Sequence, residues 1–291
     1  MSTLATLPDS ELARLHEQFA PCNVELAGGA VVGVRDTVAG SLRDPVLVCL
    51  HGIGSGSASW LDCALAIAPH ARLIAWDAPG YGESTPLPQA RPTARDHARR
   101  LGALLQALAI DDYVLVGHSL GALTAAAHAA DPAGHPPPKR LVLLSPARGY
   151  GAPEAAAQRE RVRTQRLAAL DALGIEGMAR ERAGNLLSAH ADARARAWVH
   201  WNMARLHEGG YRQAVELLCG TDLTAFAPSP MPVQVACGAL DAVTPPEACA
   251  EVAQAFGVEL SLLPDAGHAC YVEQPQAAAR LLREALAAAS H

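Results

Sequence analysis

Short apolar runs alternate with longer amphipathic segments along most of this chain of 291 residues. Apolar runs of about four to eight residues between turn-forming residues are typical of buried strands, and apolar positions three and four residues apart indicate helices. The runs predict strands over residues 23–26, 31–38, 45–50, 72–76, 112–116, 140–144, 232–238 and 258–263. The amphipathic segments predict a short N-terminal helix and helices over residues 58–68, 93–108, 122–130 and 275–289. This alternation predicts an α/β fold with parallel strand pairing and helices on both faces of the sheet.

The pattern changes between about residues 153 and 218. This segment has no strand-like run and is rich in arginine, and a proline-rich stretch at 228–232 precedes the next strand. A helical insertion between two core strands predicts a cap over the carboxyl edge of the sheet, where it supplies a pocket wall. The expected division is a first core part over residues 1–147, a cap over 148–228 and a second core part over 229–291.

The most informative motif is the segment from Gly117 to Gly121, Gly-His-Ser-Leu-Gly, which follows a strand and precedes a helix. A turn this tight strains the serine backbone and leaves no room for a Cβ at the flanking glycines. Such backbone strain is found mostly at functional sites. The motif predicts that Ser119 is a nucleophile, held clear of the sheet edge and facing a substrate.

A serine nucleophile needs a base, and the base needs an acid that orients it. Asp241 lies in the loop after the seventh predicted strand, and His268 lies in the loop after the last one. Both follow strand carboxyl ends, the edge at which open α/β sheets bind ligands. We predict His268 as the base and Asp241 as its acid, because the loop after the sixth strand begins with Ser145 and holds no carboxylate. Asp265 is the reserve acid, although it is close in sequence to His268.

The strand over 45–50 is followed by His51 and a glycine-rich loop over residues 52–56. A loop of this composition can turn its amides toward an oxygen that becomes negatively charged during the reaction. The backbone N–H groups of Ile53 and Leu120 are the predicted donors of this oxyanion hole.

Together these motifs resemble those of the α/β-hydrolase fold superfamily. The matching segments are His51-Gly52, the run from Asp77 to Ser84, the motif around Ser119, Gly238 to Asp241, and Gly267-His268. The resemblance implies an eight-stranded, mostly parallel sheet with a helical cap inserted after the sixth strand. It is closest to a bacterial subgroup of carboxylesterases, enol-lactonases and carbon–carbon bond (meta-cleavage product) hydrolases. The implied function is a serine hydrolase that cleaves a small carboxylic ester or lactone through the triad Ser119, His268 and Asp241.

Four further residues are candidates for the substrate pocket, and each also has a structural interpretation: His51, His118, Trp198 and Trp201. We expect His51 to fix the oxyanion loop and His118 to pack under the turn that carries the serine. The two tryptophans share a helical face and are more often part of a cap core than a platform for substrate. The arginines of the cap are expected mostly to be solvated, and one of them could contact a substrate carboxylate.

Composition and charge narrow the class of protein further. A net charge of −6 gives no basic surface for nucleic acid, and no apolar stretch approaches the roughly 20 residues of a membrane-spanning helix. The seven cysteines are scattered and include no Cys-x-x-Cys pair, which favours a reducing cytoplasm. No group of histidines, cysteines and carboxylates has the spacing of a metal site. We expect a cytoplasmic enzyme with a small-molecule substrate and without metal or cofactor; a homo-oligomer is compatible with the sequence.

Three alternatives stay open at this point. A carbon–carbon bond hydrolase would use the same triad, but that type typically carries asparagine where this chain has His118. A non-catalytic small-molecule binding protein would have no chemical need for a complete triad. The glycine-rich loop over 52–56, with Asp77 ending the next strand, has the placement of a dinucleotide-binding motif. Ser57 replaces the third glycine of that motif, which argues against this alternative.

Overall fold

The computed structural model describes residues 6–37, 46–132 and 134–289, and within them eight strands form a single sheet. The spatial order is β1-β2-β4-β3-β5-β6-β7-β8. β2 pairs antiparallel with both β1 and β4, and the remaining neighbours are parallel. The strands are β1 (Pro21–Glu25), β2 (Val31–Asp36), β3 (Val46–Leu50), β4 (Arg72–Trp76), β5 (Tyr113–His118), β6 (Arg140–Leu144), β7 (Val233–Gly238) and β8 (Leu260–Leu263). The prediction of an eight-stranded, mostly parallel sheet is confirmed.

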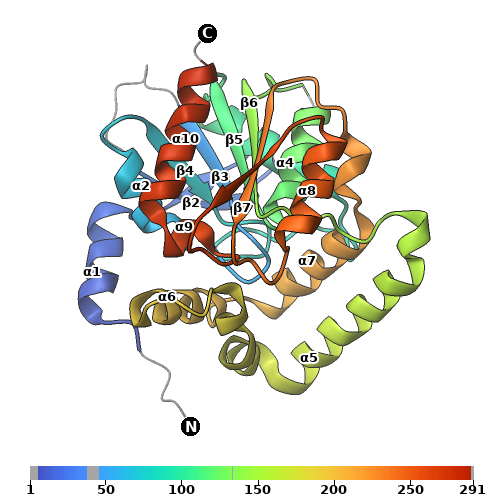
Figure 1. Cartoon of the computed structure of the whole chain (residues 1–291). Coiled ribbons are helices and arrows are strands. Elements are labelled where there is room, and N and C mark those ends of the chain that lie inside the picture. The colour runs from blue at the N-terminus through green and yellow to red at the C-terminus, as the bar shows by residue number, and fades with distance from the viewer. Residues whose placement is uncertain (1–5, 38–45, 133, 290–291) are drawn as a thin grey trace.

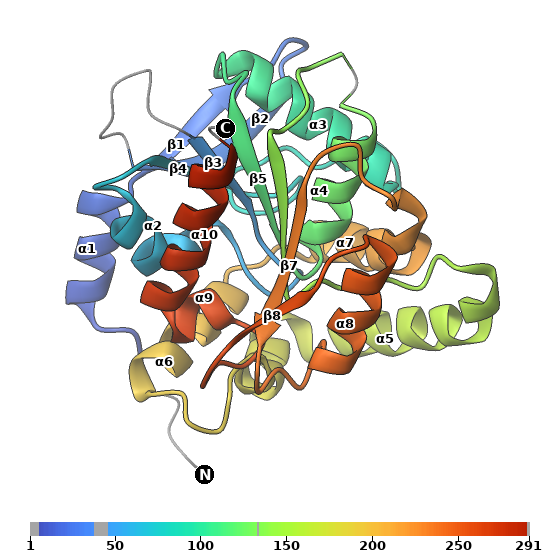
Figure 2. The same cartoon turned by 45° about the horizontal axis from the view of Figure 1, so that its top comes forward.

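The centre of the sheet is buried on both faces, because helices pack against each side (Figure 2). Every residue of β3 and β5 is buried, as expected for parallel strands covered by helices. One face is covered by α2 (Leu61–Ile67) and α10 (Pro275–Ala289). The other face is covered by α3 (Ala94–Ala107), α4 (Gly121–Ala130) and α8 (Pro246–Ala255).

The chain between β6 and β7 is helical and lies below the sheet in the view of Figure 1. Its α-helices are α5 (Ala156–Arg182), α6 (Ala193–Met203) and α7 (Glu208–Gly220), with short 3-10 turns η2 (Pro153–Ala155), η3 (Ala183–Leu186) and η4 (Leu223–Phe226). We call residues 153–226 the helical insertion. Gly174 has a φ of 62°, a left-handed conformation that glycine tolerates, and it breaks α5 into two segments. The division of the chain into core and cap domains stays a prediction.

The N-terminal helix α1 (Asp9–Gln18) is connected to the helical insertion through charged side chains. Arg194 of α6 lies 2.7 Å from Glu11 of α1 and 2.6 Å from Asp62 of α2. These contacts hold one end of the insertion against the core. No helix among the described residues is long and apolar enough to cross a membrane.

Some element boundaries differ from the sequence-based predictions. The predicted helix over 58–68 is divided into a 3-10 turn, η1 (Ser57–Trp60), and α2. The apolar pattern does not predict α8 or α9 (Cys270–Glu273). The second is a single turn, and the buried side of α8 consists of small residues, so neither gives a strong amphipathic signal. Val38 and Pro45, at the ends of two predicted strands, lie outside the described residues.

Candidate active site

Ser119 lies at the apex of a sharp turn between β5 and α4. Its φ of 52° is in the left-handed region, which non-glycine residues rarely adopt. A Cβ at Gly117 would lie 2.6 Å from Ala122 Cα, and one at Gly121 would lie 2.5 Å from the Leu50 carbonyl oxygen. Glycine is therefore required on both sides of Ser119, because strand, turn and helix approach one another too closely for any side chain. The turn holds the strained serine at the carboxyl edge of the sheet.

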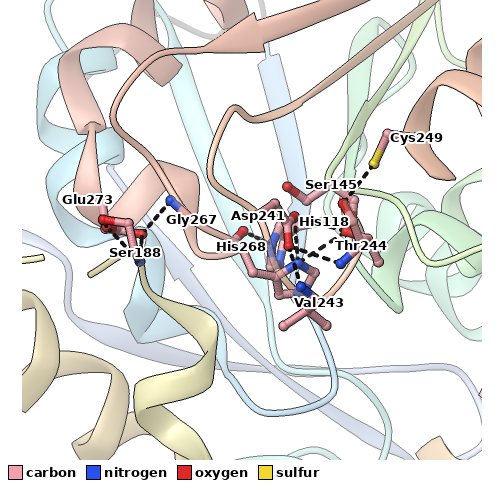
Figure 3. Close-up of polar contacts among 10 residues, drawn as sticks. All are labelled: His118, Ser145, Ser188, Asp241, Val243, Thr244, Cys249, Gly267, His268 and Glu273. Carbon is pink, nitrogen blue, oxygen red and sulfur yellow. Dashed lines mark hydrogen bonds and ion pairs between the residues drawn. The ribbon is translucent and has the colours of Figure 1, made fainter. Parts of the chain in front are cut away.

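His268 and Asp241 are joined by a hydrogen bond of 2.9 Å between His268 Nδ1 and Asp241 Oδ2 (Figure 3). The carboxylate also accepts the backbone N–H groups of Val243 at 2.8 Å and Thr244 at 2.9 Å. The Thr244 hydroxyl lies 2.9 Å from Asp241 Oδ2. An ionised carboxylate only accepts hydrogen bonds, so Nδ1 carries the proton and Nε2 of the imidazole is left as an acceptor.

Burial acts to raise the pKa of Asp241, but the hydrogen bond and the charge interaction with His268 outweigh it and lower this pKa to about 2. The amide of Thr244 acts in the same direction. Asp241 is thus a carboxylate throughout the neutral pH range. Asp265, the reserve acid, is exposed and lies outside this arrangement.

The loop after β3 carries Ile53 and the turn after β5 carries Leu120, and both residues line the cavity that contains Ser119. Among the described residues, neither Ile53 N–H nor Leu120 N–H has a hydrogen-bond acceptor. The carbonyl of Ile53 accepts the Tyr81 hydroxyl at 3.0 Å, which fixes the orientation of this peptide. His51 fixes the other side of the loop, with Nδ1 2.8 Å from the Gly52 carbonyl oxygen and Nε2 accepting the Ala78 amide at 3.0 Å.

A cavity of about 500 Å³ brings these groups together. The core contributes Ser119, His268 and the loop from Gly52 to Ser55, and the helical insertion closes the cavity from the other side. Ser119 and His268 both line this cavity, but no partner among the described residues lies within hydrogen-bonding distance of Ser119 Oγ. In unliganded sites such a bond often forms only when substrate binds.

Comparison with known proteins identifies the family to which this site belongs. The model of the family described as "alpha/beta hydrolase fold" matches residues 45–275. This chain belongs to the α/β-hydrolase family. The resemblance seen in the sequence is therefore confirmed.

Individual relatives of this α/β-hydrolase differ in how much of it they match. It is 28% identical over 256 residues to "Putative carbamate hydrolase RutD" of Enterobacter cloacae, which covers 85% of this chain and 93% of the relative. The protein of that name in Klebsiella pneumoniae is 40% identical over 80 residues, 27% of this chain and only 30% of the relative's length. The solved structure of the enol-lactonase from Burkholderia xenovorans superposes with a TM-score of 0.78 at 24% identity, over 91% of this chain and 100% of that one. At this identity the superposition shows a shared fold.

The four further pocket candidates lie in different places. His118 lines the cavity of the α/β-hydrolase, whereas His51 lies outside it and contacts the loop after β3. Trp198 is buried within the helical insertion and stacks on Trp201 at a centroid distance of 5.4 Å. Trp201 contacts Arg205, whose guanidinium carbon lies 4.6 Å from the ring centroid. Neither tryptophan lines the cavity that contains Ser119.

His118 supports the backbone of the predicted base. Its Nε2 lies 2.9 Å from the carbonyl oxygen of His268, and its Nδ1 is buried without a partner among the described residues. Burial is the main reason why the pKa of His118 falls to about 3, so the ring is neutral and Nε2 donates to this carbonyl. His118 thus connects the loop that carries His268 to the turn that carries Ser119.

Several side chains that line the cavity or contact the loop of His268 were not predicted from the sequence. Arg166, Arg182 and Tyr211 of the helical insertion line the cavity, and the arginine-rich composition is the only sequence signal for the first two. Glu273 of α9 also escapes prediction. Its carboxylate accepts the Gly267 amide at 2.7 Å and the Ser188 hydroxyl at 2.6 Å (Figure 3). Glu273 therefore ties the helical insertion to the loop that carries His268.

No group of three or more histidines, cysteines and carboxylates among the described residues is arranged to hold a metal ion.

Proposed function

We propose that this α/β-hydrolase is a serine hydrolase that cleaves a small carboxylic ester or lactone through an acyl-enzyme. The observation that carries the proposal is that the turn bearing Ser119 and the loop bearing His268 line the same cavity. The strained turn presents Ser119, and the hydrogen-bonded pair of His268 and Asp241 presents an imidazole to the same space. The amides of Ile53 and Leu120, which have no acceptor among the described residues, supply hydrogen-bond donors for an oxyanion in that cavity.

In the proposed reaction, His268 takes the proton of Ser119 while its Oγ attacks the carbonyl carbon of the substrate. Asp241 keeps the imidazole in the required tautomer and stabilises the imidazolium that forms. The amides of Ile53 and Leu120 bind the negatively charged oxygen of the tetrahedral intermediate. His268 then protonates the leaving alcohol, and a water molecule, deprotonated by His268, releases the acid and restores Ser119.

Hydrolysis of 4-nitrophenyl esters with graded acyl lengths tests this proposal. Wild type and Ser119→Ala are compared, with circular dichroism as the control for folding. Wild type should hydrolyse esters with short acyl groups, and its rate should fall as the acyl group becomes too long for the cavity. The kcat of Ser119→Ala should be lower by a factor on the order of 10⁴ or more. Equal turnover by both proteins would contradict the proposal. Absence of turnover would favour carbon–carbon bond hydrolysis, or a binding protein if Ser119 also resists a fluorophosphonate.

A carbamate is the second candidate substrate. The relative that matches this chain over 85% of its length carries the name of a carbamate hydrolase, and a carbamate presents the same kind of carbonyl to Ser119. Assay of a 4-nitrophenyl carbamate beside the ester of equal size separates the two. A higher kcat/KM for the carbamate would favour a carbamate as the natural substrate. Rapid ester hydrolysis with slow carbamoylation of Ser119 would favour an ester.

A further inference from the structure

Two arginines line the cavity that contains Ser119 without a carboxylate partner. No carboxylate among the described residues lies within 4 Å of Arg166 or Arg182. Some other arginines of the helical insertion are paired with carboxylates, such as Arg163 with Glu216 and Arg212 with Asp171. A partly buried cation is costly unless an anion compensates it, so the two unpaired arginines point to an anion that comes from outside the chain.

Arg166 and Tyr211 together present several hydrogen-bond donors to the cavity. Nη1 of Arg166 donates to the Tyr211 hydroxyl at 3.2 Å, which uses one of the five N–H groups of the guanidinium. The other four have no acceptor among the described residues. Tyr211 is only 4% exposed, and no acceptor for its hydroxyl hydrogen is found in the described part of the chain. A carboxylate fits these donors, because its two oxygens can accept from the guanidinium fork and from the phenol.

This pair lies close to the oxyanion loop. Tyr81 donates to the Ile53 carbonyl, and burial raises its pKa, while Tyr211 and Arg166 lie near enough to Tyr81 to influence it electrostatically. The first turn of α7 also contacts the turn before Tyr81, since a Cβ at Gly80 would lie 2.6 Å from Gly210 Cα. A substrate whose carbonyl faces Ile53 and Leu120 thus has Arg166 and Tyr211 in the same cavity.

Glu181 also lines the cavity, and its negative charge repels a substrate carboxylate there. It is exposed to solvent, whereas Arg166 and Arg182 are partly buried, so the field of Glu181 is screened more strongly. Two arginines against one glutamate leave the wall formed by the insertion with a net positive charge.

We propose that Arg166 and Tyr211, assisted by Arg182, form a binding site for a carboxylate of the substrate, separate from the carbonyl that Ser119 attacks. The substrate class is therefore an ester or lactone that carries a free carboxylate, such as a monoester of a dicarboxylic acid. This inference rests on the proposed function for its catalytic step, while the binding of the carboxylate can be tested without catalysis.

The kinetic test compares mono-4-nitrophenyl adipate with the same compound capped as its methyl ester. A second pair, 4-acetoxybutanoate and its methyl ester, places the carboxylate on the alcohol side. Wild type should prefer the free acid in at least one pair by about 10- to 100-fold in kcat/KM, the range expected for a hydrogen bond to a charged group. Arg166→Met should remove this preference mainly through a higher KM for the free acid. Arg166→Lys should keep part of the preference, and Tyr211→Phe should weaken it.

The matched control is Arg161→Gln, because Arg161 lies on the same helix, is exposed and does not line the cavity. No preference for the free acid in either pair, or a preference that survives Arg166→Met, would overturn the inference. Calorimetric titration of adipate into Ser119→Ala is the test that needs no turnover. Binding that is lost in Ser119→Ala/Arg166→Met would support the carboxylate site even if wild type hydrolysed no ester, and absence of binding would count against the site alone.

Discussion

Replacing Asp241 tests whether this residue orients the imidazole of His268 without disturbing the fold. The carboxylate of Asp241 accepts hydrogen bonds from two backbone amides as well as from His268 Nδ1. Asp241→Asn should lower kcat by about 10³- to 10⁴-fold, because an amide allows the imidazole to take the wrong tautomer. Steady-state kinetics on a short 4-nitrophenyl ester measure this effect.

Asp265→Asn is the control for that experiment, since Asp265 is the other acid near His268 in sequence and is exposed. Its φ of 55° is a conformation that asparagine tolerates well, so the variant should fold and react as wild type does. Near-normal activity of Asp241→Asn, or a large loss in Asp265→Asn, would show that the acid has been misidentified.

Residues at strand ends could be placed from sequence, whereas residues on the helical insertion could not. Ser119, Asp241 and His268 each follow an apolar run, and parallel strands bring their carboxyl ends to one edge. Arg166 and Tyr211 reach the cavity because of how α5 and α7 pack against the core. The break of α5 at Gly174 sets part of that packing, and no periodicity of the sequence indicates its direction.

At the scale of elements, the short helix α9 couples the helical insertion to the loop that carries His268. Glu273 of α9 accepts the amides of Gly267 and Ser188 as well as the Ser188 hydroxyl. A Cβ at Gly267 would lie 2.5 Å from the Ser188 nitrogen, so the two segments are in direct contact at this point. The position of His268 therefore depends on a contact between Ser188 and Glu273, which are 85 positions apart in the sequence.

Glu273→Gln should lower both stability and turnover. The amide replaces one accepting oxygen by a donor that faces other donors, which should cost about 1–3 kcal/mol in the free energy of unfolding. Because the loop of His268 would lose its anchor, kcat should fall while KM changes little. Urea denaturation and ester kinetics measure the two effects. Glu284→Gln, at an exposed position of α10, should change neither, and an unaltered Glu273→Gln protein would refute the anchoring role.

The central strands β3 and β5 were predictable as elements because apolar runs buried on both faces leave a clear signal in the sequence. The short helices of the second core part left none, and α9 consists of four residues. The sequence also contains no signal for the contact between Glu273 and the helical insertion, because it joins an irregular segment to a single helical turn.

At the scale of the whole molecule, buried histidines make stability depend on pH. Burial is the largest cause that lowers the pKa of His97 to about 4, of His118 to about 3 and of His128 to about 4. Their ordinary value is 6.5, so below that pH the unfolded chain binds protons that the folded protein does not. Above pH 6.5 these rings are neutral in both the folded and the unfolded chain, so they do not lower the free energy of unfolding. As the pH falls from 6.5 toward 4, proton binding by the unfolded chain lowers the free energy of unfolding progressively.

The free energy of unfolding should therefore fall between pH 7.5 and pH 5, by up to about 1.4 kcal/mol per pH unit for each such histidine. Urea denaturation at several pH values measures the slope. His97→Gln should reduce the slope, whereas replacement of the exposed His190 by Gln should leave it unchanged. A stability that stays constant over this range would show that the buried histidines are not held neutral by the fold.

The central claim is that Ser119 becomes acylated during turnover, and mass spectrometry of the protein quenched during hydrolysis of 4-nitrophenyl acetate tests it most directly. We predict an acetyl group on Ser119 that accumulates when the proton transfer of deacylation is slowed by Asp241→Asn, and no adduct in Ser119→Ala. Continued ester hydrolysis without an adduct on Ser119, or by Ser119→Ala at the rate of wild type, would contradict the assignment of Ser119 as the nucleophile.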